Sequence, residues 1–146
     1  SDPRVNAIWD FMHKEFPSIK CVGNYKNIST ACASVEDLVK EYNQSKIYIN
    51  MNMSSSSALK EAMLCGCVPV TMSDDLNDTV EDGVNGYVCM DLLEMKQKVE
   101  ILLSNPEMAN DMSQKAKESL SERCSVNNFV DAWSQIFNTI QKGIKQ

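Results

Sequence analysis

The spacing of apolar residues in the first third of the chain predicts two helices and a strand. Val5–Phe16 carries apolar residues at helical intervals and stops before Pro17, so we expect a helix there. Ser18–Gly23 is a short apolar run ending in a turn signal, which predicts a strand. Ser34 is a favourable N-cap residue, and Asp37 three positions later strengthens it as the start of a second helix. The apolar face of that helix consists of Val35, Leu38, Val39 and Tyr42.

The middle of the chain has the order strand, helix, strand. Lys46–Met51 and Cys67–Met72 are short apolar runs typical of buried strands. Ser57–Leu64 between them has helical spacing, and Gly66 suits the end of that helix. Because Pro69 has no backbone donor, we expect it at the start of its strand or at an end of the sheet.

The rest of the chain is predicted to contain one more strand and then only helices. We expect a short helix over Leu76–Glu81, a turn over Asp82–Gly86 and a strand over Tyr87–Met90. Longer helices follow over Leu92–Leu103, over Pro106–Arg123 and after Ser125. The last of them carries the apolar residues Phe129, Trp133, Ile136, Phe137 and Ile140.

This order of elements predicts an α/β domain. Strands that alternate with helices are joined by right-handed crossovers, so the sheet is parallel and has helices on both faces. The 146 residues are enough for one domain with a single core, and the C-terminal part is purely helical. The chain opens on a helix rather than a strand, which is unusual for this architecture.

Composition and charge exclude several classes of function. The chain is 43% hydrophobic and 23% charged, as is ordinary for a globular protein. A net charge of -6 argues against a nucleic-acid-binding surface, which needs a basic stripe. No apolar run approaches the roughly 20 residues that span a bilayer, so we expect no transmembrane segment.

The cysteines and the single histidine limit the possible metal chemistry. We interpret the six cysteines as free thiols that act mainly as small buried hydrophobes, and hence expect a reducing compartment. A disulfide or metal framework is the less favoured alternative, since Cys65-Gly66-Cys67 is too tight for the usual metal knuckle. His13 is the only histidine, which rules out multi-histidine sites.

Four consecutive serines bridge the second predicted strand and its helix, at positions Ser54, Ser55, Ser56 and Ser57. The first turn of a helix leaves its amides unpaired, and with the helix dipole these amides favour an anion. Small side chains let a diphosphate approach the backbone, and hydroxyls add donors. The alternative interpretation is a capped, solvated turn without a ligand.

Glu61 lies one helical turn beyond these serines. A carboxylate accepts paired hydroxyl donors well, so this position favours a contact with a sugar hydroxyl next to a bound phosphate. The alternative is a solvated glutamate on a helix surface.

Several segments, from Val35–Tyr42 through Glu61–Val70 to the C-terminal helices, resemble those of the GT-B retaining glycosyltransferases of family 4. Glu61–Val70 (EAMLCGCVPV) resembles that family's "EAMACG-PVV" segment. Asp78–Val88 (DTVEDGVNGYV) resembles its "EiVxDGxNGxLv" segment. Val35–Tyr42 and the C-terminal helices resemble the flanking elements, so that the resemblance spans roughly residues 18 to 140 in order.

The resemblance implies a Rossmann-like, donor-binding C-terminal domain, which is a single half of a GT-B fold within a longer protein. Such a domain binds a nucleotide-diphosphate sugar, usually with UDP or GDP, for transfer of a hexose. Glu61 would contact the ribose hydroxyls and Ser54–Ser56 the phosphate. Tyr25 and the segment Thr30–Cys32 would border the nucleobase.

The partner implied by the resemblance is an N-terminal acceptor-binding domain of the same protein. No cofactor and no metal is implied. We expect a cytoplasmic location, with the absent domain as the part that would reach a membrane surface.

The chain also departs from the family pattern. Met53 stands where the family has an acidic residue that contacts the donor sugar, and Ser73–Asn77 replaces a glycine pair. The family's first strand, with its diphosphate-gripping Arg/Lys pair, lies before residue 1 or is absent.

Three hypotheses therefore stand. The first is the donor domain of a retaining glycosyltransferase, inactive on its own. The second is a glycosyltransferase-like module kept for binding or scaffolding, which Met53 favours. The third is a nucleotide- or phosphosugar-binding domain with the same architecture and different chemistry.

Overall fold

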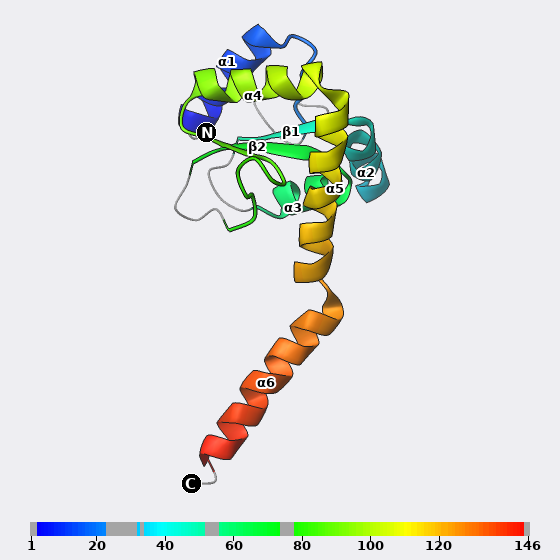
Figure 1. The fold of residues 1–146 in the computed structure, drawn as a ribbon, viewed down its shortest axis with the longest axis vertical. Helices are drawn as coiled ribbons and strands as arrows, with labels where there is room; N and C mark the ends of the chain where they lie inside the picture. Colours follow the sequence, from blue (N-terminus) through cyan, green and yellow to red (C-terminus); the bar gives the residue numbers. More distant parts are fainter. Residues whose placement is uncertain (1–2, 23–31, 33, 52–55, 74–77, 145–146) are drawn as a thin grey trace.

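The computed structural model describes residues 3–22, 32, 34–51, 56–73 and 78–144 of the chain. Its elements in chain order are α1 (Pro3–Glu15), α2 (Val35–Gln44), β1 (Ile47–Asn50), α3 (Ser57–Leu64), β2 (Val68–Met72), β3 (Tyr87–Cys89), α4 (Leu92–Ser104), α5 (Pro106–Arg123) and α6 (Val126–Ile144). The predicted α/β fold with a helical C-terminus is confirmed (Figure 1).

The sheet has the strand order β1-β2-β3, and both pairings are parallel. Ile47 pairs with Val68 and Asn50 with Thr71, while Tyr87 at the start of β3 pairs with Val70. Because all three strands run the same way, their carboxyl ends lie at one edge.

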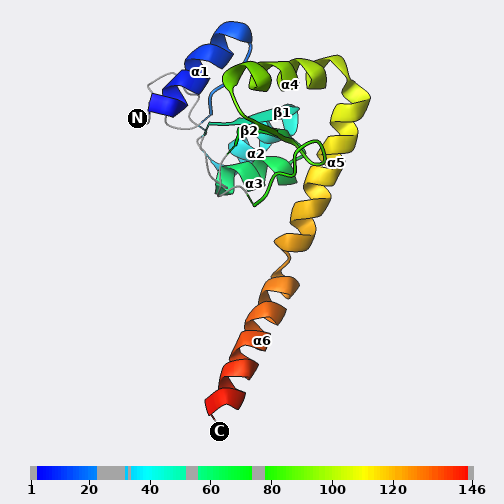
Figure 2. The same ribbon diagram turned by 60° about the vertical axis from the view of Figure 1, so that its left-hand side comes forward.

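Two apolar cores lie on opposite faces of this sheet. On one face, α1 and α4 pack over the sheet, where Met12 of α1 and Met95 of α4 join Val70 of β2 in one core. On the other face, α3 packs under Tyr48 and Val88. The helix α5 contributes its first half to one core and its second half to the other, so it closes one edge of the sheet (Figure 2).

Side chains cap the N-termini of α2 and α4. Ser34 Oγ accepts a hydrogen bond from the Asp37 amide at 3.1 Å, which confirms the predicted N-cap of α2. Asp91 caps α4 in the same way through the Glu94 amide at 2.8 Å. Each cap satisfies one amide that the helix itself leaves unpaired.

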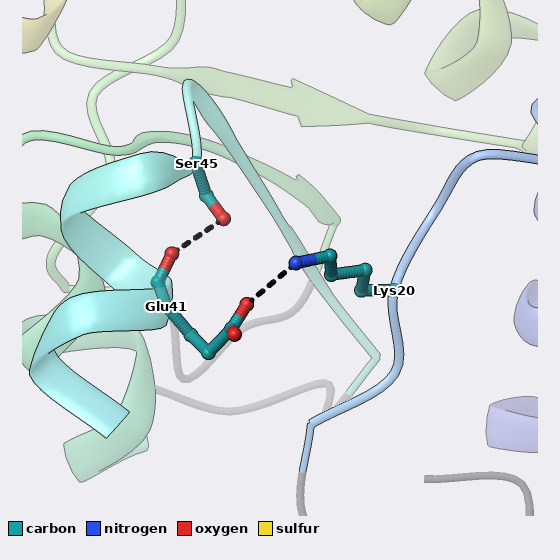
Figure 3. Close-up of polar contacts among 3 residues, drawn as sticks. All are labelled: Lys20, Glu41 and Ser45. Carbon is teal, nitrogen blue, oxygen red and sulfur yellow. Dashed lines mark hydrogen bonds and ion pairs between the residues drawn. The ribbon is translucent and has the colours of Figure 1, made fainter. Parts of the chain in front are cut away.

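Ion pairs tie the peripheral helices to their neighbours. Lys20 Nζ lies 2.9 Å from Glu41 Oε2 and joins the segment after α1 to α2 (Figure 3). Lys96 Nζ lies 2.7 Å from Glu15 Oε2 and joins α4 to α1. The hydrogen bond from Lys96 lowers the pKa of the Glu15 carboxyl. Such exposed pairs orient elements and add little stability.

Two of the predicted elements are wrong in the part that the structure describes. Residues 18–22 form no strand of the sheet, and only Val22 makes a β-bridge. Residues 78–81 are not helical, because the Asn85 side chain holds their backbone in an open turn. Asn85 Oδ1 accepts from the Glu81 amide at 2.8 Å, and its Nδ2 donates to the Thr79 carbonyl at 3.2 Å.

The predicted apolar face of α2 is only half buried. Tyr42 is buried against Ala62 and Cys67, whereas Val35 is 72% and Val39 40% exposed. The reason is that α2 contacts the sheet at its edge, through its last turn.

Pro69 lies at the start of its strand, as predicted. The Val68 amide bonds to the Lys46 carbonyl on the β1 side, so the alternation of a strand turns the Pro69 position toward β3. There Gly86 approaches closely: a Cβ on Gly86 would lie 2.6 Å from the Pro69 carbonyl oxygen. Pro69 has no amide hydrogen on that side and Gly86 has no side chain, so the two residues can lie this close together.

The helix α6 extends away from the α/β body in both views (Figures 1 and 2). Its large apolar side chains are exposed: Val126, Phe129, Val130, Trp133, Ile136 and Phe137. Trp133 stacks at an angle between Phe129 and Phe137, with ring centroids 6.1 and 5.7 Å away.

The contact between Gly86 and Pro69 is testable by substitution. Gly86→Ala places a methyl group against backbone and should lower the free energy of unfolding by about 2–3 kcal/mol. Gly83→Ala is the matched control: its site has open space but a φ of +73°, so only about 1 kcal/mol is expected. Urea unfolding measures both, and equal stability of Gly86→Ala and the parent would contradict this packing.

Candidate functional site

The carboxyl edge of the sheet meets the N-terminus of α3. β1 ends at Asn50, β2 at Met72 and β3 at Cys89, and α3 begins at Ser57 after the connection from β1. In open α/β sheets ligands bind outside this edge, where helix N-termini offer amides and a positive dipole end.

Ser56 is the N-cap of α3. Its Oγ accepts a hydrogen bond from the Leu59 amide at 3.2 Å, and the Ser56 carbonyl accepts from the Lys60 amide. By helix geometry, the amides of Ser57 and Ala58 have no acceptor one turn earlier within the helix. The cap thus leaves the end of α3 with donors that suit an anion.

Four of the residues singled out in the sequence lie outside the described residues. They are Tyr25, Met53, Ser54 and Ser55. Their roles stay predictions. Ser56 and Ser57, in contrast, are placed at the start of α3.

Glu61 is exposed on α3, one turn past its N-cap. Burial raises the pKa of Tyr42 to about 12, and the negative charge of Glu61 adds to this rise. Burial, with the same carboxylate among the further causes, also raises the pKa of Tyr48. The charge of Glu61 therefore acts on both Tyr42 and Tyr48, whose rings meet edge to face with centroids 6.1 Å apart.

Cys32 belongs to the same neighbourhood. It is half-buried, and its charge is a minor cause of the raised pKa of Tyr42. The charges of two predicted site residues, Glu61 and Cys32, thus both act on Tyr42, although the two are 29 residues apart in the sequence.

A buried polar pair at this edge was missed in the sequence. Asn50 Nδ2 donates to Thr71 Oγ1 at 3.2 Å, and the two residues are 2% and 3% exposed. The available signal was a polar residue at the end of each apolar strand run, Asn50 in KIYINM and Thr71 in CVPVTM.

Comparison with known proteins assigns the family. A family model described as glycosyl transferase-like matches residues 7–135. The chain belongs to this glycosyl transferase-like family. The resemblance to glycosyltransferases is thereby confirmed at family level.

One curated relative is an uncharacterized glycosyltransferase of Haemophilus influenzae (strain ATCC 51907 / DSM 11121 / KW20 / Rd). It is 28% identical over 153 residues, which cover 88% of this chain and 43% of the relative. The glycosyl transferase-like chain therefore spans less than half the length of the curated relative it matches.

Solved structures share the fold. TarM matches with a TM-score of 0.72 at 18% identity, over 90% of this chain and 31% of the TarM chain. Sucrose-phosphate synthase from Thermosynechococcus elongatus matches with a TM-score of 0.67 at 13% identity, over 98% of this chain and 36% of the synthase chain.

A cavity of about 230 Å³ lies at the opposite, amino edge of the sheet in this glycosyl transferase-like chain. It is lined by Ser45, Lys46, Gly66, Ser113 and Lys117 among others. The helices α2 and α3 end there, and their negative dipole ends disfavour an anion. Its volume is also below the roughly 300 Å³ of the smallest usual ligand pockets, so it is not the candidate donor site.

Within the described ranges, no group of three or more His, Cys, Asp or Glu side chains is placed to hold a metal ion. Across the same residues, no helix is long and apolar enough to cross a membrane.

The cysteines of the described residues are free, as predicted. Cys21, Cys67 and Cys89 are buried, Cys32 and Cys65 half-buried, and Cys124 exposed. The Cys67 thiol donates to the Tyr42 carbonyl oxygen at 3.2 Å. Burial raises the pKa of Cys67 and of Cys89 to about 12 each.

The raised thiol pKa values predict a loss of stability at alkaline pH. Between pH 9 and 10.5 the Cys67 thiol ionises in the unfolded chain but stays neutral in the folded one, so rising pH favours unfolding. Cys67→Ala should flatten the decline of the unfolding free energy by up to about 1.4 kcal/mol per pH unit. Urea unfolding across this range measures the slope, with Cys124→Ala, at an exposed site, as the matched control. Parallel slopes for Cys67→Ala and the parent would contradict the burial of this thiol.

Proposed function

We propose that the chain is the donor-binding, C-terminal domain of a family 4-like retaining glycosyltransferase that transfers a hexose from a UDP- or GDP-sugar. One observation carries the proposal: α3 starts at the carboxyl edge of a parallel sheet, with exposed Glu61 one turn from its N-cap Ser56. Membership of the glycosyl transferase-like family supports it.

The chemistry of this arrangement matches a nucleoside diphosphate. The first-turn amides of α3 and the helix dipole favour the phosphates, and their charge is best stabilised as the leaving group departs. The Glu61 carboxylate accepts hydrogen bonds from two neighbouring ribose hydroxyls. The proposal also assigns half-buried Cys32 to the border of the nucleobase, on the resemblance of its segment to the family.

The proposal includes a second, acceptor-binding part of the same protein. The curated relative and the solved structures that match are two to three times as long as this chain, which supports such a part. The exposed apolar face of α6 supports it as well. An apolar surface of several hundred Å² marks a contact with another protein surface.

A substitution of Glu61 tests the binding site. Glu61→Ala should weaken UDP or GDP binding about tenfold or more, because each hydrogen bond to a charged group contributes about 1.5–3 kcal/mol. Thermal melting at increasing nucleotide concentration measures the affinity, and the exposed side chain means that the melting temperature without ligand should stay unchanged. The matched control is Glu118→Ala, an exposed glutamate on α5.

Equal affinity of Glu61→Ala and the parent would contradict the ribose role. Absence of a melting shift with every nucleotide at millimolar concentration, for this chain and for the longer protein, would contradict donor binding itself.

Met53 favours a second candidate function, a glycosyltransferase-like module that binds without catalysis. A turnover assay distinguishes the two candidate functions. If the longer protein is an enzyme, it releases the nucleoside diphosphate when it is incubated with a sugar nucleotide. Met53→Glu should raise that rate if the missing carboxylate limits it, and a module that only binds would show no turnover with either residue.

A further inference from the structure

Two polar side chains interrupt an apolar surface beneath α3. Alternation along the strands puts Tyr48 and Asn50 of β1, Thr71 of β2 and Val88 of β3 on the face that α3 covers. Tyr48 and Val88 pack in the core there, while Asn50 and Thr71 occupy the same face at the carboxyl edge. Both are almost fully buried, at 2% and 3% exposure.

The hydrogen bonds of this pair have a definite order of donors and acceptors. Thr71 Oγ1 accepts from Asn50 Nδ2 at 3.2 Å and donates to the Met72 carbonyl at 3.3 Å. Asn50 and Thr71 are also direct partners in the strand register, so the bond runs across the last rung of the β1–β2 ladder.

Strand pairing does not require this bond. The backbone ladder already joins β1 and β2 from the Val68 amide onward, and four residue pairs are in register. Burying an amide and a hydroxyl costs free energy that two apolar side chains would not. Their place, at the carboxyl ends of β1 and β2 on the face that α3 covers, points to a role in the geometry of that edge.

We propose that Asn50 and Thr71 are positioning residues, whose hydrogen bond holds the carboxyl ends of β1 and β2 so that the first turn of α3 presents its amides to a diphosphate. This inference rests on the proposed function for the ligand. The placement of the first turn of α3 is independent of any ligand.

Substitutions that remove the bond, with one or with both of its partners, provide the test. The double variant Asn50→Leu/Thr71→Val replaces both partners by apolar groups and should fold with a melting temperature at or above the parent's. Thr71→Val removes the hydroxyl alone, and Thr71→Ser keeps it. Ser113→Ala is the matched control, because its Oγ donates to the Gly66 carbonyl at 2.7 Å at the opposite edge of the sheet.

The first readout is amide hydrogen exchange in the whole chain without ligand. In Thr71→Val and in the double variant, exchange in the first turn of α3 should rise at least about fivefold, with α4 and α5 unchanged. Thr71→Ser should restore the parent's rates, and Ser113→Ala should leave the first turn of α3 unchanged. Exchange that rises equally in all elements, or not at all near Ser57, would overturn the positioning role.

The second readout is affinity for UDP and for uridine. The double variant should bind UDP about tenfold more weakly and uridine as well as the parent does, because only the phosphate contacts depend on the first turn of α3. Equal affinity for UDP would overturn the proposal. A parent that binds neither compound contradicts the proposed function instead, and the exchange rates then decide the positioning role.

Discussion

Two parallel strands cannot be joined by a tight turn, and this constraint organises the whole structure. The chain leaves β1 at one edge of the sheet and must enter β2 at the other, so the connection runs through α3 along the sheet face. The helix consequently starts at the carboxyl edge and ends at the amino edge. A single topological requirement therefore places the positive end of a helix dipole beside the ends of β1 and β2.

The packing of the two sheet faces keeps that arrangement in place. Leu59 and Met63 fix α3 against the sheet and against Ala116 and Leu120 of α5. The polar residues near the edge do not take part in this core. Glu61 is exposed on α3, and the Asn50–Thr71 bond joins the carboxyl ends of β1 and β2. The core contacts of α3 and its proposed ligand contacts thus use different faces of the same helix.

Local signals were sufficient to predict most elements. The bounds of α3 and α5 follow from the serine and proline that open them and from the residues that end them, because caps act within one turn. Capping by Ser34 and the start position of Pro69 were predicted for the same reason. Membership of a glycosyl transferase-like family was also predicted, because its motifs are contiguous in sequence.

Features that depend on distant residues could not be predicted. The helix expected up to Glu81 is replaced by a turn that Asn85 holds, and Asn85 is itself bonded to Ser119 of α5 at 3.1 Å. The exposure of Val35 follows from the docking of α2 at the sheet edge, and helical periodicity carries no information on that. The Asn50–Thr71 bond needs the β1–β2 register, which a single chain pattern does not specify.

In the proposed site, the N-terminus of α3 binds the phosphates of a nucleotide. Titration of the nitrogen-15-labelled chain with UDP and GDP, followed by amide chemical shifts, tests it at residue level. We expect the largest shifts on the amides of Ser57 and Ala58 and on the neighbours of Glu61. Shifts confined to the cavity around Lys46, Ser113 and Lys117, or no shifts with either nucleotide, would contradict it.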